Sequence, residues 1–164
     1  MPGVNKHRSV EKAASANVAR LGEVLSFMRL LWRVSHGLEA SSKRMLSELG
    51  VTGPQRLVLR IVGQNPKIAP GELAKVLHVH PSSLTGVLRR LERARLLLRE
   101  RDPADGRRAR LKLTPMGRQI NGRRAGTVEA AVQHAMASLP QATLRAAERA
   151  LKAIAAELDP GQAD

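Results

Sequence analysis

Apolar residues recur at helical spacing along most of the chain, and this pattern predicts a mainly helical protein. A first long helix is predicted from Leu21 onwards, because one of its faces is almost entirely apolar. It is expected to end near residues 42–49. That face consists of Leu21, Val24, Leu25, Met28, Leu31, Trp32, Ser35 and Leu38. A second helix is predicted to start after Thr52 and to reach Gly63. Gln55 can complete a reciprocal cap with Thr52, and Pro54 suits the first turn.

A short helix, a tight turn and another helix follow. Residues 70–77 (PGELAKVL) open with proline and an early glutamate, residues 78–80 form a connection, and Pro81 opens the next helix. The latter has a buried stripe at i, i+3, i+4, i+7 spacing, made of Leu84, Val87, Leu88 and Leu91. Its opposite face carries Ser82, Ser83, Thr85, Gly86, Arg89 and Arg93. This arrangement is typical of a helix-turn-helix.

The apolar period changes from helical to alternating after Leu96, in the segments LLLRERD and RRARLKLT. The second segment places Ala109, Leu111 and Leu113 on one face and Arg108, Arg110 and Lys112 on the other. The intervening Asp-Pro-Ala-Asp-Gly supplies residues that favour turns. The pattern therefore predicts a two-stranded wing directly behind the helix-turn-helix.

The remainder of the chain reads as two further helices. Thr114 and Pro115 predict the start of a fifth helix that runs to about Ala137. Leu139 and Pro140 are expected to break it. A sixth helix is then predicted to run to Leu158. The sixth helix has an apolar seam at alternating steps of three and four, formed by Leu144, Ala147, Leu151, Ile154 and Leu158. Such a seam suits pairing with another helix.

The charge of the chain gives the first indication of function. The net charge is +14, and residues 75–124 hold 14 basic side chains against four acidic ones. A positive field of this kind attracts polyanions, although a composition rich in arginine and alanine also arises from high-GC coding. The sequence has no cysteine, which excludes disulfides, thiolate metal ligands and a cysteine nucleophile. No apolar run approaches the roughly 20 residues of a membrane span, so a cytoplasmic protein without a membrane partner is expected.

Double-stranded DNA is the partner that these features favour. A recognition helix needs short hydrogen-bonding side chains near its N-terminus, which Ser82, Ser83 and Thr85 supply, and cations further along. Arg89 could grip a guanine edge or only a phosphate, and Gly86 lets the backbone come close. In the wing, Arg107, Arg108 and Arg110 are the predicted minor-groove probes. Asp102 or Asp105 could orient the Arg107 guanidinium. Taken alone, the hairpin could equally be a solvated surface turn.

The segment ELAKVLHVHPSSLTGVLRRLERARLLLRERDPADGRRARLKLTPMGR resembles the winged-helix core of the multiple antibiotic resistance regulator (MarR) family of bacterial regulators. Its wing matches the form D-P-x-D-x-R followed by L-x-L-T-x-x-G, and TGPQRLVLRIV and MRLLWRVSHGLE also fit. The matching positions on the recognition helix are Pro81, Ser82, Ser83, Thr85, Gly86 and Arg89. Asp105 and Arg107 match the family's wing pair.

The resemblance implies a homodimer whose first and last helices intertwine, with two winged helices on a palindromic operator and often a small-molecule effector. The chain is then divided into a flexible basic arm (1–17), a helical dimerisation region (18–49 and 115–160) and a winged helix-turn-helix lobe (50–114). The residues expected to form the dimer are Leu21, Val24, Leu144, Leu151, Ile154 and Leu158. We therefore expect a sequence-specific transcriptional regulator that acts as a repressor.

Two positions depart from the family pattern. His80 stands where a serine commonly caps the recognition helix, which weakens the cap unless the imidazole replaces it. Arg95 stands where a glycine commonly ends that helix. A left-handed conformation at Arg95 would cost ~1 kcal/mol or more.

Trp32 and His36 share a helical face and could line an effector cleft, or simply pack in the core. His78 and His80 lack a third ligand, so they are expected to be surface histidines and no metal or other cofactor is predicted. No phosphate-binding glycine loop, nucleophile motif or carboxylate pair indicates an enzyme. The alternative from another class is a helical interaction protein whose basic surface docks on an acidic partner or anionic membrane.

Overall fold

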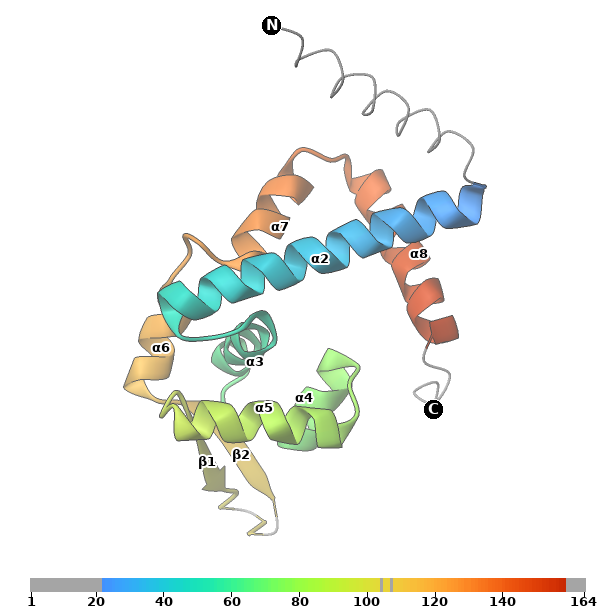
Figure 1. Ribbon diagram of the computed structural model, residues 1–164. Helices are drawn as coiled ribbons and strands as arrows, with labels where there is room; N and C mark the ends of the chain where they lie inside the picture. The colour runs from blue at the N-terminus through green and yellow to red at the C-terminus, as the bar shows by residue number, and fades with distance from the viewer. Residues whose placement is uncertain (1–21, 104, 107, 159–164) are drawn as a thin grey trace, which may run out of the picture. The chain divides into compact units, whose positions relative to one another are not determined.

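The computed structural model describes residues 22–103, 105–106 and 108–158 (Figure 1). Its contacts divide the chain into two units, Met1–Ala40 and Ser41–Asp164. The elements in chain order are α2 (Glu23–Leu49), α3 (Gly53–Gln64), α4 (Pro70–Leu77), α5 (Pro81–Arg93), β1 (Leu97–Arg101), β2 (Ala109–Leu113), α6 (Pro115–Gly122), α7 (Val128–Ala137) and α8 (Gln141–Leu158). This order confirms the predicted fold class, a mainly helical winged helix-turn-helix.

The helix starts follow the caps predicted from sequence. The Gln55 backbone N–H donates to Thr52 Oγ1 at 3.4 Å, and the Thr52 N–H donates to Gln55 Oε1 at 2.8 Å, so the reciprocal cap of α3 is formed. The Gly53 N–H also donates to Ser42 Oγ at 2.7 Å. That bond joins the C-terminal part of α2 to the start of α3.

The core of the lobe is aliphatic, as the scarcity of aromatic residues requires. It unites the buried faces of α3, α4 and α5 with the inner face of the hairpin. Its members are Val51, Val58, Leu59, Val62, Leu73, Ala74, Leu84, Leu88, Leu91, Leu96, Leu97, Leu111 and Leu113. Helix α5 and the hairpin are therefore held on one shared core, which fixes their mutual position.

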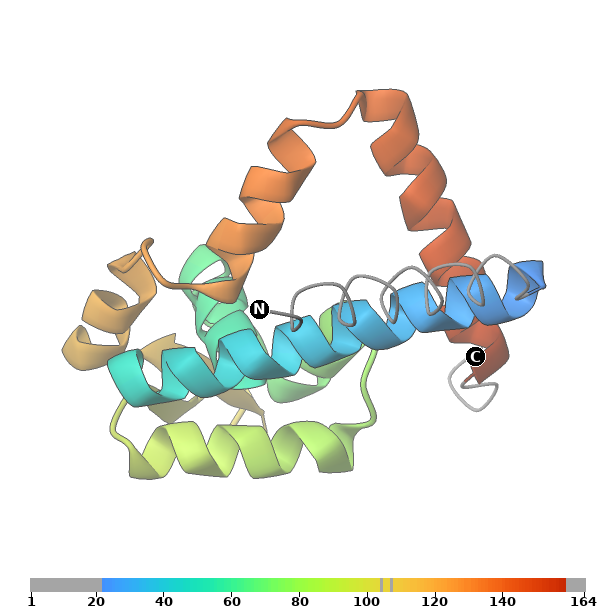
Figure 2. The same ribbon diagram turned by 45° about the horizontal axis from the view of Figure 1, so that its top comes forward.

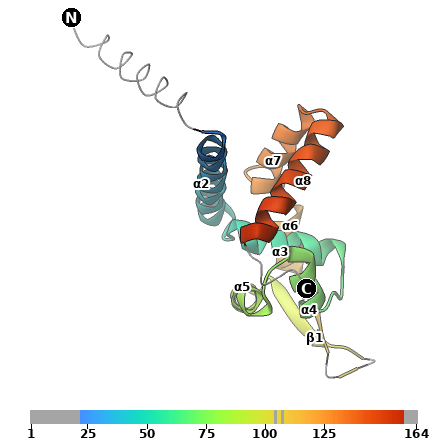
Figure 3. The same ribbon diagram turned by 90° about the vertical axis from the view of Figure 1, so that its right-hand side faces the viewer.

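The hairpin has the alternation predicted for a wing. Strands β1 and β2 are antiparallel, with Leu97 opposite Leu113 and Arg101 opposite Ala109. Leu111 and Leu113 are buried, whereas Lys112 is exposed. Figure 3 looks along α5 and shows the hairpin projecting beyond the helices.

The prediction of one helix from Thr114 to about Ala137 is wrong, because α6 ends at Gly122 and α7 begins at Val128. Gly126 between them has φ +72°, a left-handed conformation that favours glycine. Thr127 then caps α7 by accepting the Ala130 N–H at 3.3 Å. The predicted break before α8 is confirmed, since α7 ends at Ala137 and α8 starts at Gln141 (Figure 2).

Gly117 in α6 allows the base of the wing to close against the end of the recognition helix. A Cβ atom at this position would lie 1.9 Å from the Leu96 carbonyl oxygen. The Gly117 N–H donates to Thr114 Oγ1 at 2.9 Å, and Thr114 Oγ1 donates to the Arg95 carbonyl at 2.7 Å. The L-x-L-T-x-x-G motif therefore joins the base of the wing to the end of α5.

We expect Gly117→Ala to lower the free energy of unfolding by ~2 kcal/mol or more, because a backbone atom must move to admit the methyl group. Urea denaturation followed by circular dichroism measures this loss. The matched control is Gly122→Ala in the same helix, where an added Cβ meets nothing within 4 Å. Equal stability of the two variants would contradict the close approach.

In the part of the chain that the structure describes, no helix combines the length and apolar character needed to span a membrane.

Candidate nucleic-acid interface

Helix α5 separates a buried face from a polar face, as expected of a recognition helix. Leu84, Leu88 and Leu91 are at most 3% exposed and anchor the helix on the core. The predicted contact residues Pro81, Ser82, Ser83, Thr85 and Arg89 are all exposed, and Gly86 is half-buried. The structure therefore brings the predicted residues of this helix together on one accessible surface.

The N-terminus of α5 is capped by the imidazole of His80 in place of a serine. His80 has extended backbone angles, and its Nδ1 accepts the Ser82 N–H at 3.3 Å. The same nitrogen lies 2.7 Å from Ser82 Oγ. The imidazole therefore takes the place of a serine side chain as the helix cap, so the cap is kept.

Thr85 uses its hydroxyl proton within the helix. Thr85 Oγ1 donates to the Pro81 carbonyl at 2.9 Å, so its lone pairs remain as acceptors on the outer face. In the major groove, the donors that such an acceptor can meet are the exocyclic amines of adenine and cytosine.

The C-terminal end of α5 turns through Arg95, whose φ of 55° is left-handed. The left-handed conformation that glycine favours is thus adopted here by an arginine. The Leu96 N–H donates to the Leu91 carbonyl at 2.9 Å, and the Arg95 carbonyl accepts the Thr114 hydroxyl. These bonds offset the ~1 kcal/mol that a non-glycine residue costs in this conformation.

The acidic residues of the wing pair with its arginines. Asp102 Oδ2 lies 2.7 Å from Arg110 Nε, and Asp105 Oδ2 lies 3.4 Å from Arg108 Nε. Backbone bonds close the tip, where the Asp102 N–H donates to the Arg108 carbonyl at 2.9 Å. Arg107, the third predicted probe, lies outside the described residues. The acids thus orient the guanidinium groups of Arg108 and Arg110.

A further ion pair connects the wing to the recognition helix. Arg99 Nε of β1 lies 2.9 Å from Glu92 Oε1 of α5. Among the described residues, Arg89 and Arg93 of α5 form no ion pair with a carboxylate. Their charges are therefore available to a polyanion.

The residues predicted for a dimer and an effector lie on α2 and α8. Val24 is 71% exposed, Leu151 53% and Leu158 77%, whereas Leu144 and Ile154 are half-buried. Leu21 lies outside the described residues. Trp32 is 73% exposed and His36 is exposed as well, so Trp32 is not part of the core of the single chain.

Sequence reasoning missed a buried arginine that connects the lobe to α7. Arg56 of α3 is 1% exposed, and its Nε donates to Glu129 Oε1 at 2.7 Å. Its other guanidinium nitrogens donate to the carbonyls of Ile120 and Arg123. The only local sign in the sequence was a basic residue on the buried face of α3, three positions before Leu59.

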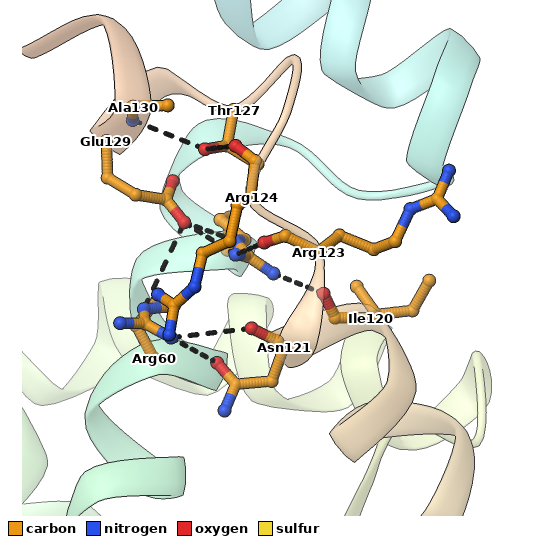
Figure 4. Close-up of polar contacts among 9 residues, drawn as sticks. Arg60, Ile120, Asn121, Arg123, Arg124, Thr127, Glu129 and Ala130 are labelled. Carbon is orange, nitrogen blue, oxygen red and sulfur yellow. Dashed lines mark hydrogen bonds and ion pairs between the residues drawn. The ribbon is translucent and has the colours of Figure 1, made fainter. Parts of the chain in front are cut away.

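The contact with Arg56 favours the ionised form of Glu129, and Figure 4 shows Glu129 beside Arg60. Burial raises the pKa of the Glu129 carboxyl, but the hydrogen bond from Arg56, a backbone hydrogen bond and the Arg56 charge outweigh burial, so the pKa is lowered. Arg60 adds a weaker contact, with Nε 4.0 Å from Glu129 Oε1. Arg60 also donates to Asn121 at 3.4 Å.

The described residues contain no group of three or more histidine, aspartate or glutamate side chains placed to hold a metal ion. His78 and His80 are exposed on either side of Val79, and His78 is left-handed with φ 50°.

A helix-turn-helix with an exposed polar recognition helix, followed by an arginine-bearing two-stranded wing, defines a winged-helix DNA-binding protein. Comparison with known proteins agrees. The model of the MarR family matches residues 51–109. A helix-turn-helix-type transcriptional repressor of Mycobacterium tuberculosis is 33% identical over 128 residues, which cover 78% of this chain and 92% of the relative. The chain belongs to the MarR family and is a transcriptional regulator.

Solved structures show the same fold. A mutant of MarR from E. coli complexed with operator DNA is 28% identical, with a TM-score of 0.65, and the match covers 80% of this chain and 95% of that one. The PcaV regulator from Streptomyces coelicolor, in complex with its natural ligand, is 27% identical with a TM-score of 0.64. That match covers 77% of this chain and 89% of PcaV.

Proposed function

We propose that this protein is a repressor that binds a palindromic operator as a homodimer. The observation that carries the proposal is the outer face of α5, where Ser82, Ser83 and Thr85 are exposed next to Arg89. Short polar side chains near the start of a recognition helix, followed by a cation, can contact base edges and phosphates in the major groove. The wing supplies Arg108 and Arg110, which their aspartate partners orient for a second contact.

Dimerisation through the first and last helices is supported by apolar side chains that the single chain leaves exposed. On α2 and α8 these are Val24, Leu25, Phe27, Met28, Leu30, Trp32, Val34, Leu38, Leu46, Leu151 and Leu158. Exposed apolar surface on this scale marks an interface. We assign dimerisation to residues 18–49 and 115–160, and DNA binding to the lobe of residues 50–114. The two recognition helices of the dimer should then lie about 34 Å apart, one turn of duplex.

Repression and release by an effector extend the proposal. The M. tuberculosis relative is named a repressor, and PcaV was solved with its natural ligand. We assign the effector contact to Trp32 and His36, which lie four residues apart and share an exposed helical face of α2. The protein acts in this proposal by binding alone, without catalysis.

Arg89→Ala is expected to weaken binding to the cognate duplex by ~1 to 3 kcal/mol, and to weaken binding to random duplex less, because a guanidinium on a base edge carries sequence information. Fluorescence anisotropy with both duplexes at one salt concentration measures the difference. Arg145→Ala, which removes the same charge from α8, is the control and should change neither affinity by as much. Equal losses on both duplexes would reduce Arg89 to a phosphate contact.

A further inference from the structure

The imidazole of His80 is fixed by the cap that it forms. The Ser82 backbone N–H can only donate, and it points to His80 Nδ1 at 3.3 Å. In the neutral ring, Nδ1 is then the acceptor and the proton lies on Nε2. Ser82 Oγ, 2.7 Å from the same nitrogen, can donate a second hydrogen bond to it. The hydrogen bonds of the cap therefore choose the tautomer.

The other ring nitrogen is a donor held ready at the start of the recognition helix. His80 is exposed, and within the described residues the hydrogen bonds of its imidazole are those that Nδ1 makes with Ser82. The Nε2–H group is therefore available to solvent or to a ligand. Because the cap already restricts the ring, a contact through Nε2 loses little side-chain entropy on binding.

We propose that His80 is a further DNA-contacting residue, whose Nε2–H donates a hydrogen bond to an acceptor of the duplex. This inference rests on the proposed function, in which the start of α5 enters the major groove. The N-terminus of a recognition helix lies close to phosphate oxygens and to base edges, and both present acceptors. One side chain thus caps the helix through Nδ1 and contacts DNA through Nε2.

His80→Asn separates the two roles. Asparagine is among the best helix N-caps, and its side-chain oxygen can accept the Ser82 N–H, but its amide is too short to replace the donor at Nε2. We expect the thermal midpoint of His80→Asn to match that of the wild type. The affinity of the variant for the cognate duplex should fall by on the order of tenfold, which is the effect of one lost hydrogen bond to a charged or strong acceptor. An unchanged affinity would overturn the proposal.

A second variant and a second duplex complete the experiment. His80→Ala should lose affinity like His80→Asn and lose stability as well, because alanine cannot cap. A retained affinity in this variant would also contradict the DNA contact. An equal loss of affinity for the cognate and random duplexes identifies the acceptor as a phosphate oxygen. A larger loss of affinity for the cognate duplex identifies it as a base edge.

Arg89→Ala, measured in parallel, distinguishes failure of this inference from failure of the proposed function. If the wild type prefers no duplex, the proposed function fails. If the wild type is selective and Arg89→Ala weakens it while His80→Asn does not, only the role of His80 is refuted.

Discussion

We expect a chain carrying both Leu151→Lys and Ile154→Lys to be a monomer that no longer binds its operator. The two side chains lie three residues apart on the apolar seam of α8, with Leu151 53% exposed and Ile154 half-buried in the single chain. In a symmetric dimer the substitutions remove four apolar side chains from the interface, each contributing roughly 1.5 to 3 kcal/mol when fully buried, and add like charges. The dimer dissociation constant should rise by more than about 1000-fold.

Loss of the dimer should abolish operator binding, because a monomer contacts only one half-site. Sedimentation velocity reports the oligomeric state, and anisotropy with labelled operator reports DNA binding. The control carries Ala153→Lys and Ala156→Lys, which add the same charge to the exposed, opposite face of α8. A seam variant that stays dimeric would refute the assignment of α8 to the interface.

Arg56→Met is expected to have the largest effect on stability, a loss of about 3 to 5 kcal/mol. The Arg56 side chain is 1% exposed and donates to Glu129 and to the carbonyls of Ile120 and Arg123. Its removal leaves those acceptors without their buried donor. Denaturant unfolding at neutral pH measures the change. Arg60→Met is the control, since the contacts of Arg60 with Asn121 and Glu129 are longer, and it should cost less than about 1 kcal/mol.

The same ion pair gives stability a defined dependence on pH. The folded pKa of Glu129 is lowered from its ordinary value of 4.5, so its contribution to stability is present above that pH and is lost as the pH falls through the folded pKa. Glu129→Gln should remove this part of the acid sensitivity. An identical acid dependence in the variant and in the wild type would show that Glu129 contributes nothing to it.

Local signals explain how much of the lobe could be predicted. The cap between Thr52 and Gln55, the proline that opens α5 and the alternation of β2 each depend on neighbours within a few residues. These local signals were therefore sufficient to predict the positions of the helix-turn-helix and the wing. The exposed face of α5 followed from the spacing of its leucines alone.

The features that sequence reasoning missed depend on distant partners. Arg56 and Glu129 are 73 positions apart in the sequence, so the residues next to either of them do not indicate the ion pair. The break between α6 and α7 was missed because Gly126 lies within an otherwise helical pattern. The carbonyls of Ile120 and Arg123 at that break accept hydrogen bonds from Arg56. In the wing, both aspartates were recognised as orienters, but spacing could not reveal that Asp102 pairs with Arg110.

Selection of bound fragments from a random duplex pool tests whether the protein recognises a palindromic operator. We expect the enriched sequence to be roughly palindromic, with half-sites centred about 10 base pairs apart, one helical turn. Winners without common sequence, retained only at low salt, would indicate a nonspecific basic protein and contradict the account.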